Sequence, residues 1–213
     1  AKVSLQAGES ITAEGGAMIA MSGHMQVETT THKKGEGSIL GALKRMVTGE
    51  SFFINHFTPA GAPGEVFFGT ALSGDMMEYN LNGPGLMVQG GSYVASAPTV
   101  NMDIQWQGFG KALFSGESMF LIHLSGSGPV ILNSFGAVYP IQVNGEYIVD
   151  TGHIVAFEES LTYEVSKAGK SWISSFLGGE GLVCKFRGQG TVWCQSHNAG
   201  SFGTALGPSL KPR

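Results

Sequence analysis

The chain has 213 residues, of which 13% are charged and 42% hydrophobic, and its net charge is −4. This apolar content is enough to bury a core and excludes a disordered chain, and the acidic balance argues against a general nucleic-acid binder. No apolar run approaches the ~20 residues that a membrane-spanning helix needs. Residues 1–6 already alternate as a strand, so we expect no signal peptide in this chain.

One sequence motif occurs three times along the chain. Residues 44–57 recur as residues 111–124, and a weaker third copy lies at 176–184. Repetition at a regular spacing usually means that one supersecondary unit has been duplicated and stacked. A motif present three times is more typical of architecture or of a multivalent surface than of a single catalytic centre.

The predicted fold class is all-β. Short runs rich in Val, Ile, Phe and Thr are separated by glycines, and helical periodicity is nearly absent, which is typical of short strands joined by tight turns. The segments Gly126–Gly128 and Gly188–Gly190 predict such turns. Three units, each too small to form an independent core, would bury one another's apolar faces in a single domain. The predicted units span about 1–70, 75–135 and 136–198, and a tail follows at 199–213.

The segment before each copy of the motif is short, apolar or aromatic, and basic. Residues 38–47 place their apolar side chains at helical spacing. Such segments could form a row of loops that binds a membrane surface or a partner protein. Alternatively, they could cover the ends of the sheets or pack against a neighbouring unit, and this second interpretation is favoured. The candidate loop residues are Leu40, Leu43, Lys44, Arg45, Lys111, Phe114, Lys170, Trp172 and Phe176.

The repeated glycine and acid of each motif are interpreted as structural positions. Equivalent places in separate units would hold the acids apart, so they do not form a catalytic pair, and we predict no catalytic residues. His56 and His123, which occupy matching strand positions, are likewise expected to be satisfied core or interface residues. The repeat positions are Gly49, Glu50, Gly116, Glu117, Gly179 and Glu180.

Metal and cofactor sites have no support in the sequence. No His-x-His, His-Glu-x-x-His or Cys-x-x-Cys pattern occurs. The sequence does not exclude a cupin-like metal centre assembled from distant strands. Cys184 and Cys194 are symmetric about Gln189, so a hairpin there would make the two sulfurs face each other. A cross-strand disulfide is then one option, and two packed free thiols are the favoured one.

Six segments together form a specific pattern: residues 44–53, 85–96, 110–117, 149–157, 179–183 and 188–196. By these segments the chain resembles the family typified by altered inheritance of mitochondria protein 24, over a match that runs from about Leu5 to Ser196. The resemblance implies a fold like that of the trp RNA-binding attenuation protein, a compact relative of the double-stranded β-helix. It also implies three units per chain, a homotrimeric ring with pseudo-ninefold symmetry, and a link to mitochondrial membrane organisation, but no catalytic residues.

These observations give three functional hypotheses. The leading one is a non-enzymatic oligomeric scaffold or binding protein, located in the cytoplasm or at the periphery of a membrane, with no cofactor and with itself as first partner. The second is a small-molecule binder or cupin-like enzyme with a pocket inside or between units. The third is RNA binding around a ring, which rests on fold analogy alone and is disfavoured by the few Lys and Arg residues.

Overall fold

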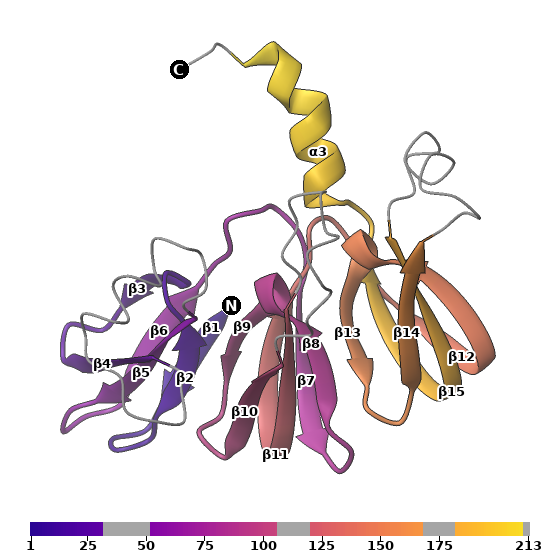
Figure 1. The fold of residues 1–213 in the computed structure, drawn as a ribbon. Helices are drawn as coiled ribbons and strands as arrows, with labels where there is room; N and C mark the ends of the chain where they lie inside the picture. Colours follow the sequence, from indigo (N-terminus) through magenta and orange to yellow (C-terminus); the bar gives the residue numbers. More distant parts are fainter. Residues whose placement is uncertain (32–51, 106–119, 168–181, 211–213) are drawn as a thin grey trace.

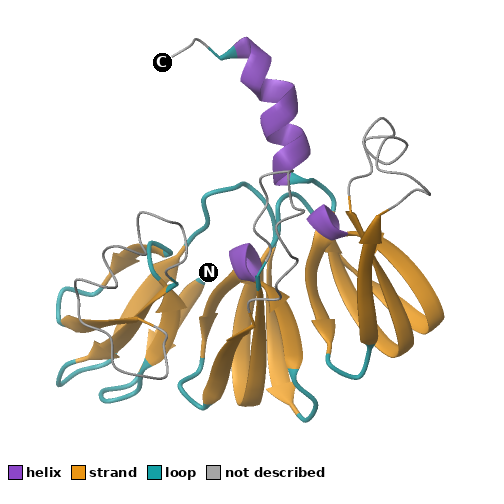
Figure 2. Cartoon of the chain, in the orientation of Figure 1, coloured by secondary structure: helices purple, strands orange, loops and turns teal. Residues whose placement is uncertain are grey.

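The computed structural model describes residues 1–31, 52–105, 120–167 and 182–210. This part of the chain is predominantly β-strand with one short α-helix, which confirms the all-β prediction (Figure 2). The strands lie in three groups along an arc (Figure 1): an N-terminal group (β1–β6), a middle group (β7–β11) and a C-terminal group (β12–β15). The strands are β1 Lys2–Leu5, β2 Ile11–Glu14, β3 Met18–Met21, β4 Met25–Thr31, β5 Phe53–Pro59, β6 Gly64–Phe68, β7 Met76–Asn82, β8 Leu86–Gln89, β9 Tyr93–Ser96, β10 Val100–Gln105, β11 Leu121–Asn133, β12 Val138–Asp150, β13 Ile154–Glu158, β14 Thr162–Lys167 and β15 Leu182–Gln195.

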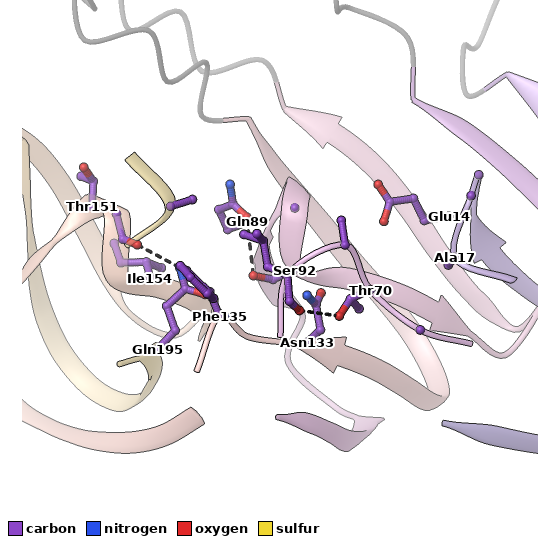
Figure 3. A pocket seen from close by; sticks show the side chains of 18 residues that line it. Glu14, Ala17, Thr70, Gln89, Ser92, Asn133, Phe135, Thr151, Ile154 and Gln195 are labelled. Carbon is purple, nitrogen blue, oxygen red and sulfur yellow. Dashed lines mark hydrogen bonds between the residues drawn. The ribbon is translucent and has the colours of Figure 1, made fainter. Parts of the chain in front are cut away.

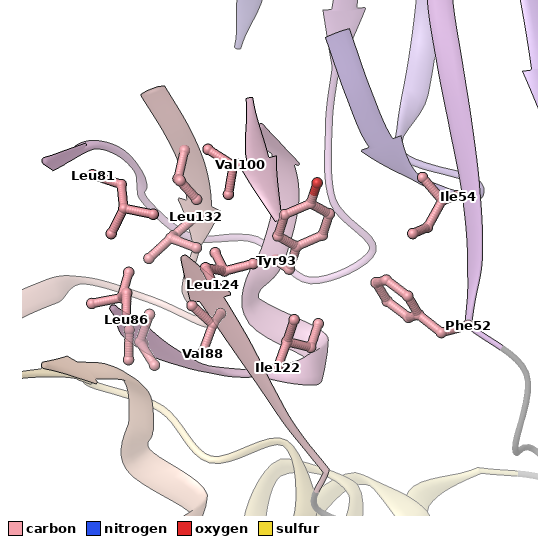
Figure 4. Close-up of a cluster of buried hydrophobic side chains, with 13 residues drawn as sticks. Phe52, Ile54, Leu81, Leu86, Val88, Tyr93, Val100, Ile122, Leu124 and Leu132 are labelled. Carbon is pink, nitrogen blue, oxygen red and sulfur yellow. The ribbon is translucent and has the colours of Figure 1, made fainter. Parts of the chain in front are cut away.

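Each group contains its own cluster of buried apolar side chains. In the middle group, Tyr93, Leu124 and Leu132 are fully buried together (Figure 4). The Tyr93 hydroxyl lies 2.9 Å from Ser96 Oγ, so its polar end is satisfied inside the core. Burying a large apolar side chain stabilises the fold by roughly 1.5–3 kcal/mol, which makes these clusters the main source of stability.

The long strands do not turn at the glycines where the sequence predicted hairpins. Strand β11 runs through Gly126–Gly128, and β15 runs through Gly188–Gly190. The first half of β11 pairs with β8 and β10, and its second half pairs with β7 and β9. The φ angles of +99° at Gly126 and +133° at Gly128 redirect the strand between these partners. The prediction of turns was therefore wrong, because the facing strands continue the ladder across the glycines.

The two cysteines consequently lie at opposite ends of one strand. Cys184 is paired with Val149 and Cys194 with Tyr139, both on β12. Both thiols are free and buried, as favoured from the sequence, although the hairpin that would have made them face each other does not form. Burial raises the pKa of Cys184 to about 12 and that of Cys194 to about 11, so neither is a reactive thiolate at neutral pH.

Two strand pairings join the groups. Strand β2 pairs with β9 through Ala13 and Ala95, and β8 pairs with β13 through Val88 and Ala156. All four side chains are fully buried. The three groups therefore share one 12-stranded sheet, which fixes the arc in Figure 1, while β1, β6 and β3 form a separate 3-stranded sheet.

The C-terminal tail contains a helix that the sequence pattern did not predict. Helix α3, Ala199–Leu206, begins after Asn198, whose side chain accepts a hydrogen bond from Ser201 N at 3.1 Å. The helix projects from the strands (Figure 1) and buries none of its residues. Its Phe202 ring packs edge-on against Phe135 with centroids 5.4 Å apart. In the described part of the chain, no helix has both the length and the apolar character to cross a membrane.

Candidate functional site

All the loop and repeat positions predicted from the sequence lie outside the described residues. This holds for Leu40, Leu43, Lys44, Arg45, Lys111, Phe114, Lys170, Trp172 and Phe176, and for Gly49, Glu50, Gly116, Glu117, Gly179 and Glu180. The helical pattern at 38–47 lies there as well. These expectations stay predictions.

The two repeated histidines do have partners. His56 Nδ1 lies 3.1 Å from the hydroxyl of Thr12, and its Nε2 lies 3.1 Å from that of Thr30. His123 Nε2 lies 2.7 Å from a carboxylate oxygen of Glu159. Both act as structural cross-links, as expected. Within residues 1–31, 52–105, 120–167 and 182–210, no cluster of three or more His, Cys, Asp or Glu side chains is arranged to hold a metal ion.

A cavity of about 700 Å³ lies at the ends of several strands (Figure 3). Residues from all three strand groups line it. The short 3-10 turns η1 Gly90–Ser92 and η2 Thr151–His153 contribute to its wall. Its polar side chains are Glu14, Thr70, Gln89, Ser92, Asn133, Thr151 and Gln195.

Among the described lining residues, Glu14 is the single carboxylate, and it lies at the C-terminal end of β2. Burial raises its pKa from 4.5 to about 7, because the charged form loses hydration. The described lining residues include no Lys, Arg or His that could compensate. At neutral pH this carboxylate is therefore held close to the balance between its charged and neutral forms.

Hydrogen bonds fix the opposite side of the cavity. The Gln195 amide accepts from Phe135 N at 2.8 Å and donates to the carbonyl of Gly152 at 2.9 Å. With its amide nitrogen facing η1, Asn133 donates to the carbonyls of Gly91 and Ser92 at 3.2 and 3.1 Å. These bonds tie the turns to the strand ends, so the wall is preformed.

Two glycines of the wall occupy positions where a side chain would be strained or crowded. A Cβ atom on Gly152 would lie 1.9 Å from the side-chain amide nitrogen of Asn198, and Gly16 has a φ of +97°. None of the residues that line this cavity was predicted from the sequence to form a site. A usable signal was present, since Glu14, Gln89 and Asp150 each stand two residues before a glycine in the three segments predicted to correspond.

Known proteins and a known family match this chain over nearly its whole length. The family model described as "Mitochondrial biogenesis AIM24" matches residues 1–197. An uncharacterised protein of Streptococcus pyogenes serotype M6 is 29% identical over 210 residues, which cover 96% of this chain and 84% of that protein. A crystal structure of a Streptococcus pyogenes protein from a structural genomics consortium aligns with a TM-score of 0.81 at 26% identity, covering 98% of this chain and 93% of that one.

Proposed function

The chain belongs to the mitochondrial biogenesis AIM24 family, and we propose that it is an assembly protein built of three repeated units. Copies would join head to tail through the free edges at the two ends of the arc and close into a ring. Three copies is the number that the family resemblance implies. The observation that carries the proposal is the exposure of apolar residues at those two edges, at positions whose counterparts within the chain are buried.

Support for the repeat comes from strand register. Each group has a central strand that carries a His or a Lys. The residue opposite it on one neighbouring strand is acidic, and the residue opposite it on the other neighbouring strand is Thr, Met or Ile. The sets are His56 with Glu28 and Thr12, His123 with Asp103 and Met87, and Lys185 with Glu164 and Ile148. Three coincidences of register and charge favour a common origin.

A β-bulge supports the same alignment. Strands β3, β9 and β13 each skip one residue in their pairing, at Ile19, Val94 and Val155. Val94 is packed in the apolar cluster of the N-terminal group and is 1% exposed. Val155 is packed in that of the middle group and is 0% exposed. At each junction, therefore, the bulged residue of one group inserts into the core of the preceding group.

The corresponding residue of the first group has no preceding group within the chain. Ile19 is 68% exposed. Among the described strands, its strand β3 pairs only with β6, and the second half of β12 pairs only with β15. Open strand edges carrying apolar side chains are templates for pairing with another chain. We infer that β3 of one copy pairs with residues 146–150 of the next, as β13 pairs with β8.

A contact between two different surfaces produces a ring when its rotation closes. Residues 32–51, 106–119 and 168–181 connect β4 to β5, β10 to β11 and β14 to β15, and would recur around that ring. We propose that their apolar and basic residues, among them Leu43, Phe114 and Trp172, bind a membrane surface. Weak contacts repeated in this way sum to useful avidity.

Sedimentation measurements test both parts of the proposal. Analytical ultracentrifugation of the chain at micromolar concentration should give a single trimeric species, and a monodisperse monomer would refute the assembly. Anionic vesicles should co-sediment the wild type but not the Leu43→Asp/Phe114→Asp/Trp172→Asp variant. Equal co-sedimentation of both, or of neither, would refute the membrane contact and leave a protein partner as the target of these segments.

A further inference from the structure

The cavity at Glu14 has the dimensions of a ligand site. Its volume of about 700 Å³ falls within the roughly 300–1,000 Å³ that small-molecule sites occupy. Polar groups and apolar side chains such as Leu72 and Ile154 share the lining. Such a mixture suits a compact polar molecule with some exposed carbon skeleton.

Three polar side chains of the cavity, Glu14, Thr70 and Thr151, offer acceptors to a ligand. Thr70 Oγ1 donates to the carbonyl of Leu72 at 2.9 Å, and Thr151 Oγ1 donates to that of Leu182 at 3.1 Å. Each hydroxyl has one proton, so these two retain only lone pairs for a ligand. The Glu14 carboxylate adds further acceptor capacity. A ligand rich in O–H and N–H donors would therefore complement this lining.

The charge of Glu14 determines which kind of ligand group fits beside it. The described lining residues place no cation beside Glu14. A partly buried carboxylate in such surroundings is costly to keep ionised, and an ammonium group would restore the balance with charge-assisted hydrogen bonds. A neutral ligand could not do so, and an anionic one would be repelled.

We propose that this cavity binds a small hydroxylated amine, of the size of an amino sugar or an amino alditol. The ammonium group contacts Glu14 and the hydroxyl groups contact Thr70, Gln89 and Thr151. This inference goes beyond the proposed assembly and does not rest on it, because every residue involved belongs to one chain.

Saturation-transfer NMR with three matched probes tests the proposal. The probes are glucamine, which carries an ammonium group, sorbitol, which is neutral, and gluconate, which is anionic, each at millimolar concentration and about pH 8, where an aliphatic amine stays protonated. Glucamine should bind at least about tenfold more tightly than sorbitol, as a charge-assisted hydrogen bond requires. Gluconate should not bind.

Three variants locate the binding. Glu14→Gln should abolish the preference for glucamine, whereas Glu28→Gln, which removes an exposed carboxylate on β4, should retain it. Leu72→Trp places a bulky ring at the exposed edge of the cavity and should block all binding even if Glu14→Gln fails to fold. Equal signals for glucamine and sorbitol, binding that survives Leu72→Trp, or no glucamine signal with the wild type would each overturn the proposal.

Discussion

Met87 of β8 lies directly opposite Phe157 of β13, and the two side chains are only 6% and 1% exposed. This pair joins the middle and C-terminal strand groups within the chain. The proposed repeat places Ile148 and Met21 in the corresponding positions at the two ends of the arc, where they are 53% and 37% exposed. We therefore expect these two residues to meet between copies, because the same edges that associate inside the chain are left open at its ends.

A charge placed on the edge of β3 should prevent assembly. We predict that Ile19→Asp reduces the mass measured by light scattering from about 67 kDa, three times 22.3 kDa, to that of one chain. The side chain is 68% exposed in the single chain, so circular dichroism should show unchanged strand content. Val27→Asp is the matched control, since Val27 is an exposed apolar residue of β4, away from the proposed contact. Identical masses for Ile19→Asp and the wild type would count against the edge contact.

The counterpart of Ile19 at an internal junction should behave differently. Val155→Ala removes buried methyl groups from the middle cluster and should lower the free energy of unfolding by about 2 kcal/mol at any protein concentration. Ile19→Ala should lower stability only where the chain is assembled, because mass action links assembly to unfolding. Urea unfolding at several protein concentrations distinguishes the two. A concentration-independent loss for Ile19→Ala would mean that Ile19 supports its own chain.

The raised pKa of Glu14 predicts a specific dependence of stability on pH. The folded-state pKa of about 7 lies above the ordinary 4.5, so the folded chain holds its proton more tightly than the unfolded chain. This contribution is fully present below about pH 4.5 and is lost as the pH rises to about 7. Relative to Glu14→Gln, the wild type should therefore lose about 2 kcal/mol of unfolding free energy across that window, after allowance for partial solvent access.

Thermal unfolding of both proteins between about pH 4.5 and 8 measures this difference directly. Glu28→Gln serves as the control, since Glu28 is exposed. A constant difference between wild type and Glu14→Gln across the range would show that the carboxylate is solvated.

The glycines within β11 should not tolerate a side chain. Gly126→Ala forces a residue with a Cβ into a φ of +99° and brings that atom to 2.5 Å from the carbonyl oxygen of Thr99. We expect a loss of about 1–3 kcal/mol in the free energy of unfolding. Gly23→Ala, where nothing lies within 4 Å of the added atom, should change it by less than about 0.5 kcal/mol. Equal effects in denaturant titrations would contradict the role given to Gly126.

The fold class could be predicted from local patterns, but the path of the strands could not. Alternating and continuous apolar runs such as 121–124 indicated strand directly. The segment Gly126–Gly128 has the composition of a turn, yet it lies in a strand because β7 and β10 offer partners on both sides of the bend. The structure of this segment depends on its pairing with strands far away in the sequence. A local sequence pattern contains no information about such pairing.

The cavity could not be predicted from the sequence for a related reason. Glu14, Asn133 and Gln195 are far apart in the sequence and come together only because three strand groups end at the same place. Helix α3 was missed because its glycine-containing sequence is a weak helix former that depends on the Asn198 cap. His56 and His123 were correctly interpreted as structural, since their matching positions in the repeated motif were visible in the sequence.

The most direct measurement of head-to-tail assembly is disulfide trapping with a Met21→Cys/Ile148→Cys double variant. Residues directly opposite each other on antiparallel strands are within the range of a disulfide, and the natural thiols of Cys184 and Cys194 are buried. Under mild oxidation, non-reducing gels should show the double variant as a covalently closed trimer that dithiothreitol reverts to single chains, while each single variant stays unlinked. A double variant that remains monomeric, or that links no better than the single variants, would contradict the pairing of β3 with β12 between copies.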